Sequence, residues 1–141
     1  RRSKETRPPR RHIDRETFLG MCRPEAVSFF EYMLDCAQER GHEIYWGKGS
    51  FSVREYLPES EKKASFVYGY PKRTFCFYFG GLKMMPEEER RALREELLGF
   101  GIFTEHGNYT LCARLNEENL TLAREVYDLI LEKIELIVQT Y

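Results

Sequence analysis

The sequence lacks long hydrophobic runs, since none of its 141 residues lies in a stretch approaching the roughly 18 consecutive apolar residues that a membrane-spanning helix requires. Its N-terminus is rich in arginine and has no apolar segment of the kind found in a secretory signal. We therefore expect a soluble, cytoplasmic protein without a membrane partner.

Cysteine and histidine are scarce, with four and three residues. The sequence has no Cys-x-x-Cys pair and no histidine pair near a cysteine, so the ligand spacings of zinc fingers and redox sites are absent. We therefore predict no metal and no other cofactor. Cys76 and Cys112 lie in strand-like runs and Cys36 in a helical run, where a thiol usually behaves as a small buried hydrophobic group. We expect the cysteines to be reduced, as in an intracellular protein.

Catalytic motifs are also missing. None of the three histidines stands in a motif that would pair it with a nucleophile and an acid, and we interpret all three as turn or cap residues. One segment, Glu-Lys-Lys at residues 61–63, has the Glu-x-Lys form that metal-dependent nucleases use, but we expect it to lie in a charged loop rather than in a strand. We predict no catalytic residue, and a metal-dependent phosphodiesterase is the third of our functional alternatives.

Charge is nearly balanced, with 22 Lys and Arg against 23 Asp and Glu, but it is unevenly distributed. Residues 1–15 hold seven basic and two acidic groups, and residues 43–84 hold seven and four. Such basic segments are typical of proteins that bind an anionic partner, and they also arise when two parts of one domain attract each other. We predict that residues 1–15 form a basic, Arg- and Pro-rich linker or tail, and that residues 16–141 form one domain at the C-terminal end of a longer protein.

Hydrophobic periodicity alternates between helical and extended segments. Apolar residues at spacings of three and four, between Pro24 and Gly41, predict a helix over 24–40. From residue 43 the period changes to two, which is typical of strands. The predicted strands are 43–47, 50–57, 64–70, 74–80, 102–105 and 109–115, and two further helices are predicted from Pro86 and over 117–139.

The connections between the first four predicted strands are short. Short connections join antiparallel neighbours, because a parallel crossover needs a dozen or more residues. We therefore predict a four-stranded meander, a helix, a hairpin across residues 106–108 and a last helix. This order, α-β-β-β-β-α-β-β-α, indicates an α+β fold, with an antiparallel sheet of about five to six strands and three helices mainly on one face.

The last predicted helix has more apolar surface than packing on one sheet requires. Projected at 100° per residue, its apolar side chains cover about 220° of arc. The surplus stripe must face either the first helix or a second chain. The alternative functional prediction is therefore a protein-interaction or dimerisation module that binds a protein partner or forms a homodimer through Leu122, Leu129 and Leu136.

Aromatic and basic residues are interleaved along the predicted sheet, in residues 45–54 and 65–79. This pattern is typical of a core with basic turns, but an open sheet face of this composition also stacks bases and neutralises phosphates. The period alone does not tell which face is open. Our first functional hypothesis is a non-catalytic module of a larger intracellular protein that binds nucleic acid. The predicted contacts are Trp46, Lys48, Arg54, Tyr68, Tyr70, Lys72 and Arg73.

Overall fold

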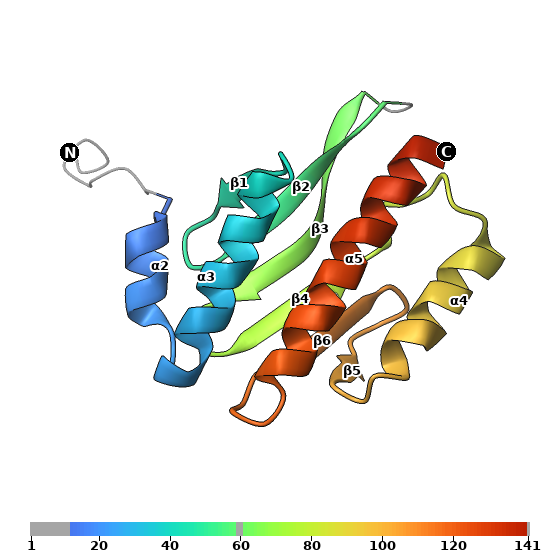
Figure 1. The fold of residues 1–141 in the computed structure, drawn as a ribbon. Coiled ribbons are helices and arrows are strands. Elements are labelled where there is room, and N and C mark those ends of the chain that lie inside the picture. Colours follow the sequence, from blue (N-terminus) through green and yellow to red (C-terminus); the bar gives the residue numbers. More distant parts are fainter. Residues whose placement is uncertain (1–11, 59–60, 141) are drawn as a thin grey trace, which may run out of the picture.

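The structure, a computed structural model, describes residues 12–58 and 61–140. Within these ranges the chain forms four helices and a six-stranded antiparallel sheet, with the helices on one side of the sheet (Figure 1). The predicted α+β class is confirmed. None of the helices in these ranges combines the length and apolarity needed to cross a membrane. The elements are α2 (Arg15–Met21), α3 (Pro24–Glu39), β1 (Glu43–Trp46), β2 (Phe51–Leu57), β3 (Lys62–Tyr70), β4 (Thr74–Tyr78), α4 (Glu87–Leu98), β5 (Phe103–Glu105), β6 (Thr110–Arg114) and α5 (Leu120–Thr140).

The strands lie in the order β1-β2-β3-β4-β6-β5, and every neighbouring pair is antiparallel. The predicted meander and the later hairpin are confirmed. Because β6 pairs with β4, the chain leaves the sheet after β4, forms α4 and returns with β5 at the outer edge (Figure 1). The register between β2 and β3 shifts at Val53 and Arg54, so Phe66 of β3 is the extra residue of a bulge.

The described residues contain one helix more than the three predicted. The Asp14 side chain accepts a hydrogen bond from the backbone N–H of Thr17 at 2.8 Å, which caps α2 and lowers the pKa of the Asp14 carboxyl. On the same helix, Phe18 is fully buried against the rings of Phe30 and Phe51. A helix of 7 residues is too short for its hydrophobic period to be recognised, and for this reason the prediction missed it.

The predicted tail, residues 1–15, lies largely outside the described residues. Of its described part, the ring of His12 packs edge-on against Tyr45, with 5.5 Å between ring centroids. The backbone N–H of Ile13 donates to the carbonyl of Gly47 at 2.8 Å. Residues 12–15 therefore contact the folded domain.

Helices α3 and α5 pack against each other and against the sheet. Phe75 of β4 lies 5.0 Å from Phe29 of α3 between ring centroids. The hydroxyl of Tyr127 on α5 is buried and donates to the carbonyl of Met33 on α3 at 2.8 Å. Most of the wide apolar arc of α5 thus packs within the chain, through the buried residues Ala123, Val126, Tyr127, Ile130, Leu131, Ile134 and Ile137.

His42, in the connection between α3 and β1, is a buried polar residue that joins α5 to the sheet. Its side chain is 2% exposed, with Nε2 2.9 Å from Oε2 of Glu135 and Nδ1 3.4 Å from Oε2 of Glu55. The guanidinium of Arg40 also donates to Glu135, at 2.8 Å. Burial opposes ionisation of Glu135, but the hydrogen bonds from Arg40 and His42 outweigh it and lower the pKa of this carboxyl below its ordinary value.

Replacing Glu135 with glutamine is expected to destabilise the protein at pH 7 by about 1–2 kcal/mol, because a buried histidine and an arginine lose a charged acceptor. A carboxyl with a lowered pKa in the folded state stabilises above the unfolded pKa, and this stabilisation disappears as the pH falls through the folded value. The difference between Glu135→Gln and the wild type should therefore shrink below about pH 4.5, as measured by urea unfolding at pH 7 and pH 3.5.

Glu132 provides the matched control. It lies on the same helix and contacts the same arginine, but at 3.9 Å and with 65% of its side chain exposed. Exposed ion pairs contribute little, so Glu132→Gln should change the stability by less than about 0.5 kcal/mol. An equal loss in both variants would contradict the role assigned to Glu135.

Candidate functional site

The face of the sheet that is turned away from the helices carries exposed aromatic and basic side chains. On β4, the buried Phe75 and Phe77 alternate with outward residues such as Tyr78, which is 37% exposed. On β3, Tyr70 is 42% exposed. The strand register extends this face across the sheet, and its outward residues include Tyr45, Ser52, Tyr68, Tyr70, Thr74, Cys76, Tyr78, Thr104, Thr110, Cys112 and Arg114.

A shallow hollow of about 790 Å³ lies on this open face, over β4 and β6. Lys72 and Arg114 bring two exposed cations to it, and none of its lining residues is acidic. A second, smaller hollow shares part of this lining and adds Tyr68, Tyr78 and Thr110. The lining of the larger hollow is Tyr70, Pro71, Lys72, Thr74, Cys76, Thr104, His106, Cys112 and Arg114.

The surface of both hollows contains a disulfide between Cys76 and Cys112, so the expectation that these two cysteines are reduced was wrong. The two residues stand directly opposite each other on β4 and β6, with their Cα atoms 4.0 Å apart, so that the thiols of two outward side chains meet. Cys22 and Cys36 are free thiols, and burial raises the pKa of Cys22 to about 11. Only these two cysteines remain in the predicted reduced state.

At the β1 end of the open face, positive charge is neutralised within the chain. The guanidinium of Arg54 lies 3.8 Å from the centroid of the Tyr45 ring. It also approaches Glu43 at 4.0 Å, and Glu43 accepts a hydrogen bond from Lys63 that holds the pKa of this carboxyl below its ordinary value. In the part of the chain that the structure describes, by contrast, Lys72 forms no ion pair. The uncompensated charge of the face is therefore at its β4–β6 end.

The structure does not bring all of the predicted contacts together. Arg54, Tyr68, Tyr70 and Lys72 lie on or beside the open face, and Lys48 is exposed in the β1–β2 turn. The ring of Trp46 instead packs against Phe18 and Phe51 on the helix side, with centroids 5.9 and 5.4 Å away. Arg73 also turns toward the helices, where it lies 3.7 Å from Glu25 of α3. Arg114, Tyr78 and His106 are among the residues of this face that the sequence prediction omitted.

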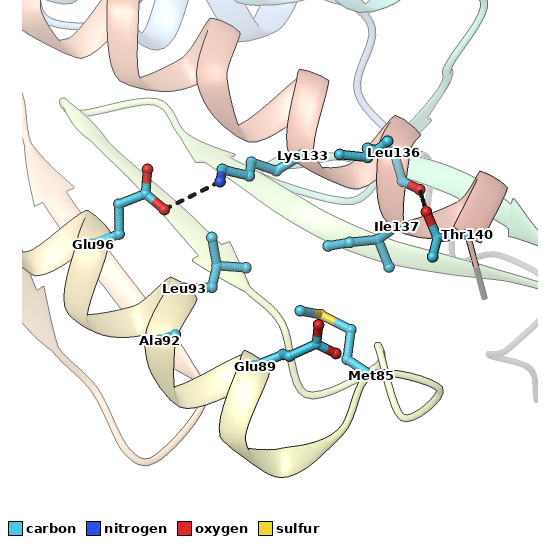
Figure 2. Close-up of a pocket in the computed structure, with 9 residues that line it drawn as sticks. All are labelled: Met85, Glu89, Ala92, Leu93, Glu96, Lys133, Leu136, Ile137 and Thr140. Carbon is cyan, nitrogen blue, oxygen red and sulfur yellow. Dashed lines mark hydrogen bonds and ion pairs between the residues drawn. The ribbon is translucent and has the colours of Figure 1, made fainter.

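The three leucines of the alternative interaction surface do not form one exposed stripe. Leu122 and Leu129 are half-buried against the core, whereas Leu136 is 61% exposed. Figure 2 shows Leu136 beside a groove between α4 and α5, where Lys133 pairs with Glu96 at 3.2 Å. Self-association through this helix stays a prediction.

A metal-dependent phosphodiesterase would require carboxylates that converge on one point. Lys62 and Lys63 of the Glu-x-Lys segment belong to β3, so the expectation of a loop was wrong for these two residues. The strand carboxylates Glu43 and Glu55, which would have to complete such a site, contact Lys63 and His42 respectively. Across residues 12–58 and 61–140, no group of three or more His, Cys, Asp or Glu side chains is placed to hold a metal ion. The structure therefore adds no ligand set to this third alternative.

Part of the chain is similar to two curated proteins that carry the name asparagine–tRNA ligase. The protein from Thermococcus gammatolerans is 36% identical over 76 residues, which is 51% of this chain and 17% of that protein. The protein from Thermococcus kodakarensis is 32% identical over 95 residues, which is 64% of this chain and 21% of that protein. The chain thus spans about a fifth of the length of these relatives. No family model matches it, and no solved structure matches it.

Proposed function

We propose that this protein is a non-catalytic, cytoplasmic module of a larger protein and binds nucleic acid through the open face of its sheet. The observation that carries the proposal is the hollow over β4 and β6. Its lining combines tyrosine with Lys72 and Arg114, which form no ion pair among the described residues, and it contains no carboxylate. Bases stack on aromatic side chains, and phosphates pair with lysine and arginine. The composition of the hollow suits both parts of a nucleotide chain.

The proposed contacts differ in part from those predicted from the sequence. Tyr68, Tyr70 and Lys72 remain, and Tyr78 and Arg114 join them because they line the same hollows. Arg54, which contacts Tyr45 and Glu43, is retained at the β1 end of the open face. Lys48 is retained as an exposed charge in the β1–β2 turn. Trp46 and Arg73 are left out because their side chains contact the helix layer.

RNA with unpaired bases is the form of nucleic acid that we propose. An open sheet face with stacking residues takes up bases that are free to leave their neighbours, as single-stranded segments allow. The names of the two relatives contain tRNA, which makes RNA the first nucleic acid to test.

In fluorescence anisotropy with a labelled single-stranded RNA, replacing Tyr70 with alanine is expected to lower the affinity about tenfold, since stacking of one base contributes about 1–3 kcal/mol. The double variant Lys72→Ala, Arg114→Ala should also weaken binding, and it should reduce the slope of log affinity against log salt by about 1.4, because two phosphates lose their cations. Tyr70→Ala should leave that slope unchanged.

The control variant removes the same charge elsewhere. Lys62 and Lys83 are exposed and lie outside both hollows, so the double variant Lys62→Ala, Lys83→Ala should retain most of the affinity. If the two double variants behave alike, the open face is not the binding surface. If no RNA or DNA binds at all, the groove beside Leu136 becomes the leading candidate, with a protein as partner.

A further inference from the structure

Three arginines gather in a small pocket that is separate from the hollow over β4 and β6. Arg90, Arg91 and Arg94 come from α4, and their spacing of one and four residues places them on one side of the helix. Asn108 and Tyr109, at the turn between β5 and β6, form the opposite wall. The pocket has a volume of about 260 Å³, and Phe79 and Glu87 complete its lining.

Two of these guanidinium groups are held in place by contacts within the chain. Arg90 pairs with Glu87 at 3.0 Å and lies 4.9 Å from the centroid of the Tyr109 ring, and the Tyr109 hydroxyl donates to the same carboxylate at 3.3 Å. Arg94 pairs with Glu105 at 2.6 Å. Groups that are already ordered lose little side-chain entropy when they bind a ligand.

The same two arginines have donors left over. The Nε atoms of Arg90 and Arg94 are buried and have no hydrogen-bond partner among the described residues. A buried donor without an acceptor is costly, so it commonly marks the place of a water molecule or an ion. Arg91 is exposed at the same pocket and forms no ion pair within residues 12–58 and 61–140.

The charge of the pocket favours an anion. The lining contains three guanidinium groups and one carboxylate, that of Glu87. A second carboxylate, that of Glu105, pairs with Arg94 but is not part of the lining. Three positive charges against two negative ones leave the pocket with a net positive charge. Guanidinium groups present pairs of N–H donors whose geometry matches phosphate oxygens. We propose that this arginine pocket, formed by Arg90, Arg91, Arg94, Asn108 and Tyr109, binds a phosphate group.

The turn between β5 and β6 connects this pocket to the open face. His106 lines the hollow, and Asn108, two residues further along, lines the arginine pocket, so their Cα atoms are at most about 7 Å apart. A nucleotide chain on the open face would therefore pass within reach of the arginines. The phosphate site stands on its own geometry, and only its assignment to nucleic acid rests on the proposed function.

Arginine side-chain NMR tests the site directly. Adding inorganic phosphate to the full chain, against sodium chloride of equal ionic strength, should shift the Nε–Hε resonances of Arg90 and Arg94 in a saturable manner. Arg124 is the matched control, because its Nε is also buried without a partner but lies on α5, outside the arginine pocket. If Arg90 and Arg94 do not shift, or if Arg124 shifts equally, the proposal fails.

Two variants test whether these arginines bind phosphate. Arg91→Ala removes an exposed side chain and should leave the fold intact while weakening inorganic phosphate binding at least threefold. Arg94→Lys retains the charge but loses the planar pair of donors, and it should weaken phosphate binding as well. Unchanged phosphate affinity in both variants would overturn the proposal.

RNA binding by the same variants identifies where the phosphate comes from. If Arg91→Ala weakens phosphate and RNA binding together, the phosphate belongs to a nucleic acid chain. If it weakens only phosphate binding, a small phosphorylated molecule is the ligand. Because the sheet-face variants are assayed separately, failure of the open face as an RNA site leaves the phosphate measurement unaffected.

Discussion

Replacing Gly69 with alanine is expected to destabilise the fold by about 3 kcal/mol. A Cβ atom at this position would lie 2.3 Å from Cε1 and 2.6 Å from Cζ of Phe51, closer than van der Waals contact allows. The ring of Phe51 cannot move away easily, because it is 1% exposed and lies between Phe18 and Phe30, with centroids 4.9 and 6.1 Å away. Alanine in a strand has a conformational advantage over glycine of about 0.5–1 kcal/mol, which the clash exceeds.

Urea unfolding at pH 7 measures this loss, and Gly20 supplies the control. Gly20 lies in α2. Apart from its chain neighbours and the nearby backbone of its own helix, no atom lies within 4 Å of the position that a Cβ atom would take there, so Gly20→Ala should stabilise the protein by up to about 1 kcal/mol. Adding Phe51→Leu to Gly69→Ala should recover part of the loss, since the smaller side chain makes room for the methyl group. A Gly69→Ala variant as stable as the wild type would mean that Phe51 does not pack over this glycine.

The fold class was predictable because local patterns determine most of its elements. The change of period at residue 43, the short connections and the Pro24 and Gly41 signals all act over a few residues. The pairing of β6 with β4 was not predictable from local patterns, because α4 and β5 lie between these strands in the sequence and the pairing depends on how the chain returns to the sheet. The Cys76–Cys112 disulfide depends on that same pairing, and for this reason the thiols looked independent in the sequence.

The candidate site was only partly predictable, because the composition of the strands does not tell which face of the sheet each side chain is on. Tyr45 and Trp46 are neighbours in one strand, so their side chains must point to opposite faces, and only one of them can belong to an open surface. Choosing that face required knowledge of which phenylalanines pack on the helices. Phe75 faces α3, which places Tyr78 and Tyr70 outward. The alternation of side chains within β1 therefore indicates that Tyr45 and Trp46 cannot both belong to the open face, which the aromatic composition alone does not indicate.

The arginine pocket was also predictable only in part. The spacing of Arg90, Arg91 and Arg94 on one helix side is visible in the sequence. Its opposite wall is not, because Asn108 and Tyr109 follow β5 and reach α4 only through the hairpin.

Reducing the Cys76–Cys112 disulfide is expected to lower the free energy of unfolding by about 3–4 kcal/mol, the largest effect of any change considered. The bond joins residues 36 apart, and closing a loop of this length removes conformational entropy from the unfolded chain. Urea unfolding of the full chain with and without dithiothreitol measures the loss. The variant Cys76→Ala, Cys112→Ala should be destabilised in both conditions, and the reductant should not change it further.

Counting the reactive thiols tests the disulfide independently of stability. The unreduced protein, unfolded in urea, should expose two reactive thiols, those of Cys22 and Cys36, and the variant Cys22→Ala, Cys36→Ala should expose none yet remain sensitive to dithiothreitol. Four thiols in the unreduced wild type would contradict the bond. Structural disulfides are rare where glutathione and thioredoxin keep thiols reduced, so the count in protein alkylated at cell lysis bears on location as well. Two thiols at lysis would argue against the proposed cytoplasmic location. Four thiols at lysis and two after oxidation would mean that Cys76 and Cys112, in the hollow over β4 and β6, are a dithiol in the cell.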